Sequence, residues 1–129
     1  MSNDFSDFVW HDANLLGIII DRTNPGNTDT IEMIVEWLDG NISKVLFCDC
    51  FAMQSEMRFG VVASESIRSF YCESEGNEIS AIKAAHVRAG QRISTLKCYT
   101  LETNSTASII KIYALSMEIN SVSSHFLIE

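Results

Sequence analysis

The chain has 129 residues, of which 17 are acidic and 9 are basic, so its net charge is −8. A composition of 47% apolar and 20% charged residues is typical of a globular protein and excludes a disordered one. The negative charge repels nucleic acid phosphates and anionic lipid, and no apolar run approaches the roughly 18 residues of a membrane helix.

The organisation along the chain indicates one domain over residues 1–129, with residues 1–6 frayed. The first thirty residues carry several acids and no cationic head, which argues against an export signal. We therefore expect a cytoplasmic protein that binds neither nucleic acid nor a membrane.

The first half of the sequence predicts three strands. Residues 14–22 contain the β-branched run LLGIII followed by a turn, which indicates a buried strand. Residues 31–38 alternate, with Ile31, Met33, Val35 and Trp37 on one face and Glu32, Ile34, Glu36 and Leu38 on the other. Asp39-Gly40 then precedes an apolar segment over 42–51. This arrangement predicts a β-hairpin, because Gly supplies the positive φ of a tight turn.

In the segment 42–51 the alternation places Val45 and Phe47 opposite to Leu46, Cys48 and Cys50. Residues 58–63 can form a further strand. Residues 64–73 fit either a strand or a helix, and we favour the strand because Phe70 and Cys72 suit one.

A helix is predicted over residues 78–89. Asn77 is its candidate N-cap and Gly90 its stop, and an apolar stripe is formed by Ile79, Ile82, Ala85, His86 and Ala89. Residues 93–102 and 107–117 form a second hairpin. The prediction is an α+β fold, in which six to seven mainly antiparallel strands form a meander with hairpins and one helix packs on the sheet.

The acidic residues are concentrated in the first third of the chain. Through Ser43 there are eight acids against Arg22 alone, a balance of −7. We expect Asp29, Glu32, Glu36 and Asp39 to form a partner-binding surface, because an acidic field speeds encounter with a basic protein.

No cofactor, metal site or catalytic residue is predicted. Cys48, Cys50, Cys72 and Cys98 lack the spacing of a zinc site and are expected to be free thiols lining a core. Phosphate-binding glycine motifs are absent from the sequence. An alternative ligand pocket could form near His11, Asp12 and Arg22.

Three strings carry a resemblance: Trp10 to Leu15 followed by Ile20-Asp-Arg22 and Pro25-Gly26, Met57 to Ala63, and Glu102 to Ser108. Together they resemble small uncharacterised bacterial proteins of the kind found among the immunity proteins of polymorphic toxin systems. The resemblance implies a cytoplasmic β-rich domain that works by binding, and it transfers no functional residue.

The resulting hypothesis is a non-catalytic interaction protein, of the immunity type, that neutralises a basic toxin through an acidic surface. The alternative is a small-molecule-binding domain or minor enzyme that uses the pocket near His11, Asp12 and Arg22. A second alternative is a homodimer formed by pairing of edge strands. Trp10 or Trp37 would be an aromatic anchor if exposed, although both are expected in the core.

Overall fold

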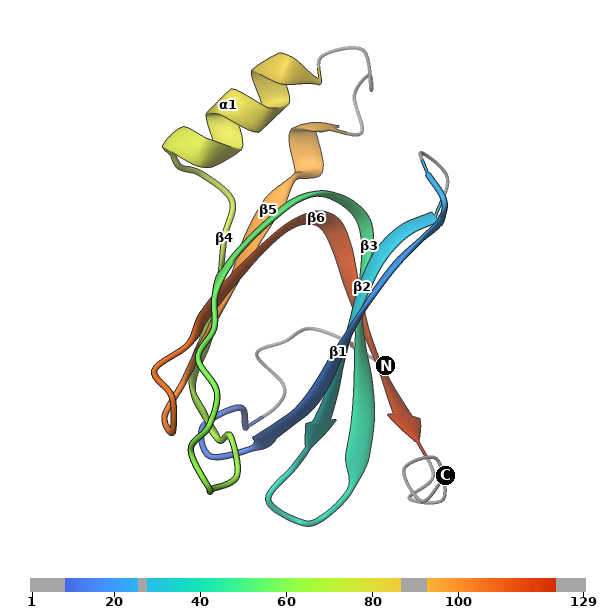
Figure 1. Cartoon of the computed structure of the whole chain (residues 1–129). Helices are drawn as coiled ribbons and strands as arrows, with labels where there is room; N and C mark the ends of the chain where they lie inside the picture. Colours follow the sequence, from blue (N-terminus) through green and yellow to red (C-terminus); the bar gives the residue numbers. More distant parts are fainter. Residues whose placement is uncertain (1–8, 26–27, 87–92, 123–129) are drawn as a thin grey trace.

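The computed structural model describes residues 9–25, 28–86 and 93–122. Its described part contains a six-stranded sheet and one helix (Figure 1). The elements are β1 (Asn14–Asn24), β2 (Thr28–Glu36), β3 (Ile42–Glu56), β4 (Ile67–Glu73), α1 (Asn77–Ala85), β5 (Lys97–Thr103) and β6 (Ile109–Val122). The region expected to fray, residues 1–6, lies outside the described residues.

The sheet consists of two three-stranded meanders that meet in the middle. Its order is β1-β2-β3-β6-β5-β4, and every neighbouring pair is antiparallel. Both predicted hairpins are present, as β2–β3 and β5–β6. The expected α+β class, mainly antiparallel with one helix, is confirmed.

The long strands β3 and β6 bend and belong to both halves of the sheet. The first part of β3, Ile42–Phe47, lies between β2 and the last part of β6. Beyond the bend, the first part of β6 lies between β3 and β5. At the bend, Asp49 has φ 56° and the β3–β6 register shifts between Cys50 and Ala52. A bulge of this kind bends a strand sharply, so the sheet folds over itself, as the arch of β3 and β6 shows (Figure 1).

The bend overturns the expected orientation of Cys50. Strict alternation would place Cys50 on the face of Leu46 and Cys48, but Cys50 packs against the core that contains Val45 and Phe47. The left-handed residue Asp49 interrupts the period of two, so the strand faces exchange at that position.

The two outer strands meet at one corner of the folded sheet. An isolated antiparallel bridge joins Asn14 to Ser66. Around it, Ile67 N–H donates to the Ala13 carbonyl at 2.6 Å, and Leu15 N–H donates to the Glu65 carbonyl at 2.8 Å. These hydrogen bonds therefore join the two outer strands of the folded sheet, at the start of β1 and at the residues just before β4.

The main core lies inside the folded sheet and is rich in aromatic rings. Trp10 is 4.2 Å from Phe70 and 4.9 Å from Trp37 between ring centroids, and Phe47 is 5.1 Å from Tyr99. Trp10 is buried and Trp37 packs against the core, as expected. Aromatic side chains each bury a large apolar surface, so this cluster contributes strongly to the core.

A second, smaller cluster lies on the outer face of the sheet, where α1 packs on it. Ile79 is the buried residue of α1, and it shares this cluster with Cys98 of β5 and with Tyr113 and Leu115 of β6. The predicted apolar stripe is only partly correct, because Ile82 contributes to the packing whereas His86 is exposed.

The ends of the helix also differ from the prediction. The N-cap is Gly76 and no side chain caps the helix, so the expected cap Asn77 is instead the first helical residue. The C-cap is His86, whose N–H donates to the carbonyls of Ile82 and Lys83. The predicted stop at Gly90 lies outside the described residues.

One strand prediction was wrong, and another was correct in position but not in burial. Residues 58–63 form a loop, because Gly60 has φ 96° and the Arg58 N–H donates to the Ser108 side chain. The strand β1 exists but is largely exposed, because it lies at the edge of the sheet. The segment 64–73, which fitted a strand or a helix, contains the strand β4.

No helix in the described ranges is long and apolar enough to cross a membrane.

The β2–β3 turn yields a test of the fold. Gly40 has φ 89°, and a Cβ added there would meet no other atom within 4 Å, so Gly40→Val strains only the backbone. We expect the free energy of unfolding to fall by about 1–3 kcal/mol. For comparison, Gly17→Ala adds a Cβ at a glycine that lacks a positive φ, where it meets Ile34 at an ordinary 3.7 Å. Urea titration measures both, and equal losses would contradict the strained turn.

Candidate interaction surfaces

Two of the four predicted acidic residues lie at opposite ends of β2. Asp29 follows the start of the strand and pairs with Arg22, at 2.8 Å between Oδ1 and Nε. Asp39 lies in the turn after the strand, where its two carboxylate oxygens accept hydrogen bonds from the Asn41 N–H and side-chain amide, both at 2.9 Å. The structure does not bring Asp29 and Asp39 together. Each has a local structural partner.

The other two acids, Glu32 and Glu36, share the outer face of β2 with Ile34 between them. The Glu32 carboxylate is 3.8 Å from the Lys44 ammonium, and both side chains are about a quarter exposed. The Glu36 carboxylate accepts a hydrogen bond from the Asn14 amide at 3.2 Å. The prediction from alternation that Glu32 and Glu36 face away from Met33 and Val35 is correct, since Met33 and Val35 are buried in the core.

A third acid joins this face from the far end of the chain. The pairing registers place Ile19, Glu32, Leu46 and Glu118 in one row across β1, β2, β3 and β6. Sequence reasoning missed Glu118 because the β3–β6 pairing is nonlocal. The one indication in the sequence was that an acidic residue stands at this position of a segment in which apolar and polar residues otherwise alternate. We call the solvent-facing side of this row, with Glu36 and Lys44, the acidic sheet face.

The alternative pocket is not assembled. His11 Nδ1 is 3.1 Å from the Arg68 carbonyl oxygen, and His11 Nε2 is 3.6 Å from the Asp12 carboxylate, with both side chains mostly exposed. Arg22 lies near the other end of β1, where it pairs with Asp29. The three residues therefore do not line one pocket. A shallow hollow elsewhere on the sheet is lined by Gln54, Ser55, Glu56, Ile109 and Lys111.

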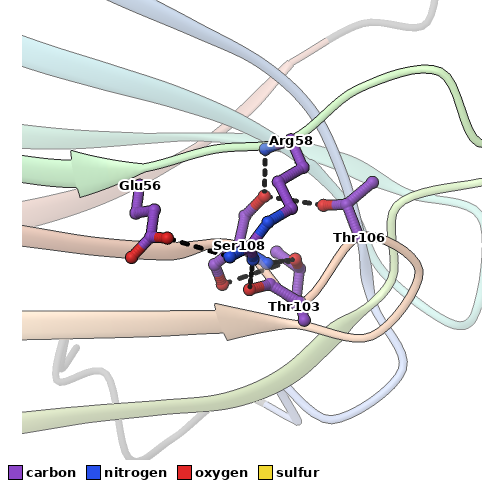
Figure 2. Close-up of polar contacts among 6 residues, drawn as sticks. Glu56, Arg58, Thr103, Thr106 and Ser108 are labelled. Carbon is purple, nitrogen blue, oxygen red and sulfur yellow. Dashed lines mark hydrogen bonds and ion pairs between the residues drawn. The ribbon is translucent and has the colours of Figure 1, made fainter.

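A dense polar cluster lies at the β5–β6 turn (Figure 2). The Ser108 N–H donates to Thr103 Oγ1 at 2.9 Å, and the Ser108 and Thr106 hydroxyls are 2.6 Å apart. The Glu65 carboxylate accepts hydrogen bonds from the backbone N–H groups of Ser105 and Thr106 and from the Thr106 hydroxyl. The carboxylate thus satisfies the donors of a tight turn in which Ala107 has φ 56°.

This cluster contains a serine, a threonine and a carboxylate, but its geometry is structural. Ser108 is completely buried, and its hydroxyl accepts a hydrogen bond from the Arg58 N–H at 3.0 Å. Nucleophilic catalysis needs an accessible hydroxyl beside an oriented base. The hydroxyl here instead joins the turn to the chain that follows β3. We call this cluster the turn clamp, consisting of Arg58, Glu65, Thr103, Thr106 and Ser108.

The turn clamp also holds the loop that carries Phe59, Val61 and Val62. The Arg58 guanidinium donates to the Ala107 carbonyl and pairs with Glu56, which fixes one end of the loop (Figure 2). Glu65 fixes the other end. Phe59 and Val62 are almost fully exposed between these ends. An anchored loop with apolar side chains in solvent is typical of a contact surface.

None of the four cysteines forms a disulfide, and two of the thiols have little nucleophilic character. Burial raises the pKa of the Cys50 thiol to about 12. Burial, with a smaller contribution from the Glu118 carboxylate, also raises the pKa of the Cys48 thiol. A protonated thiol is a poor nucleophile and a poor metal ligand. In residues 9–25, 28–86 and 93–122, no three side chains of the metal-binding types gather at one point.

The chain matches no known protein family, and no curated protein or solved structure matches it significantly.

The turn clamp can be tested through stability. Glu65→Ala leaves two backbone N–H groups and a hydroxyl without their acceptor, so we expect a loss of about 1–3 kcal/mol in the free energy of unfolding. The control is Glu75→Ala, an exposed acid whose removal should change stability by less than about 0.5 kcal/mol. Chemical denaturation compares them. An unchanged free energy of unfolding in Glu65→Ala would contradict the structural role of the turn clamp.

The raised thiol pKa predicts a dependence of stability on alkaline pH. Cys50 stays protonated in the fold up to about pH 12, whereas in the unfolded chain it ionises near its ordinary value of 9. Its contribution to stability is therefore complete below pH 9 and is lost as the pH rises towards 12. Cys50→Ser, which keeps a donor for the Phe47 carbonyl, should show a shallower decline by urea titration over this range. An equal decline of the free energy of unfolding in the wild type and in Cys50→Ser would contradict the raised pKa of the buried Cys50 thiol.

Proposed function

We propose that the protein is a non-catalytic interaction protein of the immunity type, which captures a basic protein partner such as a toxin on its acidic sheet face. The observation that carries this proposal is that Glu118 of β6 lies on the same solvent-facing side of the sheet as Glu32 and Glu36 of β2, although β2 and β6 are far apart in the sequence. A face of this kind presents carboxylates in fixed positions for charge-assisted hydrogen bonds from arginine.

The ion pair already present on this face does not prevent binding. Glu32 and Lys44 are 3.8 Å apart and both are partly solvated, a geometry that contributes little stability. An incoming guanidinium can replace the lysine at small cost. Leu46 and Ile19, both incompletely buried, lie in the same row and offer apolar contact beside the carboxylates. Mixed apolar and charged rows suit an arginine-rich partner, since its side chains are themselves amphipathic.

The long-range field supports the same proposal. The net charge of −8 attracts a basic protein from a distance, and this attraction accelerates association at low salt. Asp29 and Asp39 contribute to this field, whereas their hydrogen bonds and ion pairs serve local structure. We therefore assign them to steering and assign Glu32, Glu36 and Glu118 to contact.

Binding is favoured over catalysis by the state of the groups that could have acted as nucleophiles. The Cys50 and Cys48 thiols have raised pKa values, and the Ser108 hydroxyl is buried. The ligand pocket considered as an alternative has no assembled geometry, because Arg22 pairs with Asp29 near the far end of β1 from His11 and Asp12. These observations favour capture of a protein partner over the small-molecule alternative.

The test uses the purified product of the reading frame adjacent to this protein's gene, with association followed by surface plasmon resonance. Replacing the acidic sheet face by Glu32→Gln, Glu36→Gln and Glu118→Gln should slow association about tenfold or more at low salt, and added salt should reduce wild-type association similarly. The replacements keep side-chain shape, and in Glu36→Gln the amide oxygen can still accept the hydrogen bond from Asn14.

The matched control removes the same number of charges from the other half of the molecule, by Glu73→Gln, Glu75→Gln and Glu78→Gln. We expect a several-fold smaller effect from this control. A variant with His11→Ala and His86→Ala should bind as wild type does. Equal losses from the two acidic triples, or loss of function in the histidine variant alone, would overturn the proposal.

A further inference from the structure

Among the described residues, the outer edge of β1 beyond Leu15 is an open hydrogen-bonding edge. β1 is the first strand in the sheet order and has β2 on one side. On its other side, the contact with residues 65–67 extends only to Leu15. From Leu16 onwards the described part of the structure places no strand against it. Alternate backbone N–H and C=O groups of this stretch therefore face outwards.

This edge is also apolar. Ala13 to Ile20 contains no charged residue, and the side chains of Leu16, Ile19 and Ile20 are 45%, 47% and 56% exposed. Edge strands of monomeric proteins normally carry charges or proline that discourage pairing. Neither occurs between Gly17 and Ile20, although the chain is strongly acidic as a whole.

We propose that this edge pairs with the same edge of a second copy, giving an antiparallel β1–β1 dimer with a two-fold axis at Ile19. Register shifts after Leu15 and after Asp21 delimit a regular stretch, Gly17–Asp21, that is centred on Ile19. Pairing about that centre places Ile18 opposite Ile20 of the second copy. The sheets of the two copies then form one continuous sheet.

The register explains why the occupant is a second copy. Under the two-fold axis, Asp21 faces Gly17 of the second copy, which has no side chain to compete for space or charge. The Asp21 carboxylate accepts two hydrogen bonds from Thr23 at its Oδ1 atom, so it is already engaged within its own chain. Apolar side chains meet at the three central positions. The strand is thus complementary to its own reversed sequence, as an isologous interface requires.

The other outer strand does not offer an equivalent surface. β4 carries Arg68 and Glu73, and the start of β1 already contacts the chain at its beginning. Pairing of β1 with β4 of another copy would be a heterologous contact, which repeats from copy to copy and gives a ring or a filament. The β1–β1 arrangement closes after two copies.

The inference goes beyond the proposed capture of a basic partner, and its test uses the protein alone. Sedimentation equilibrium of the wild-type chain should show a monomer–dimer equilibrium, with a dissociation constant of roughly 1–100 μM, because edge pairing buries less than a standard interface. Ile19→Lys places two ammonium groups face to face across the axis, and it should weaken the dimer about tenfold or more. In the monomer the new lysine lies beside Glu32, which favours folding.

The decisive experiment is a charge exchange. Ile19→Lys and Ile19→Glu should each be monomeric alone, and their equimolar mixture should recover dimers, because opposite charges then meet on the axis. The control, Val62→Lys, adds the same charge at a fully exposed apolar residue in the loop after β3 and should leave the wild-type dissociation constant unchanged.

A cross-link checks the register directly. Ile19→Cys should form an intermolecular disulfide under mild oxidation, since directly paired residues on adjacent strands are close enough for one. Leu38→Cys, in the exposed β2–β3 turn, should not. A monomer at all concentrations, larger open assemblies, no recovery in the mixture, or equal cross-linking at the two positions would overturn the proposed dimer.

Discussion

The antiparallel pairing of β3 with β6 is the interaction on which the rest of the structure depends. It joins two meanders that would otherwise be separate three-stranded sheets, each with one face in water. Small isolated sheets are marginally stable because they bury too little apolar surface. The bend at Asp49 lets the joined sheet fold over itself and enclose the aromatic core. The same pairing brings Glu118 into the row of Glu32, so the core and the acidic sheet face arise from a single ladder.

Local features of the fold were predictable from the sequence, and nonlocal ones were not. The Asp39-Gly40 turn and the alternation around Met33 and Val35 identify the first hairpin, because turn chemistry and side-chain period act over a few residues. The strand expected at 58–63 fails because its backbone donor at Arg58 bonds to Ser108, fifty residues away. No local pattern reports such a partner.

The residues of the candidate site show the same difference between local features, which the sequence predicts, and nonlocal ones, which it does not. Alternation places Glu32 and Glu36 on one face correctly, since both lie on a regular strand. It places Cys50 on the wrong face, because nothing in the sequence marks Asp49 as a left-handed residue. Arg22 is close to His11 and Asp12 in sequence, yet an extended strand separates them by about 3.3 Å per residue. The sequence predicts a buried β1, whereas the strand is largely exposed. A short apolar run has the same sequence pattern in a central strand and in an edge strand.

The corner where β1 meets β4 joins three segments that are distant along the chain. Residues 13–15 bond to residues 65–67, and the β5–β6 turn bonds to Glu65 and to Ser66. Each of these segments orders the next, so the contacts depend on one another. The contacts at this corner therefore form one cooperative unit. Because Trp10 lies directly beside this corner, opening it would admit water to the aromatic core at a position far from the helix.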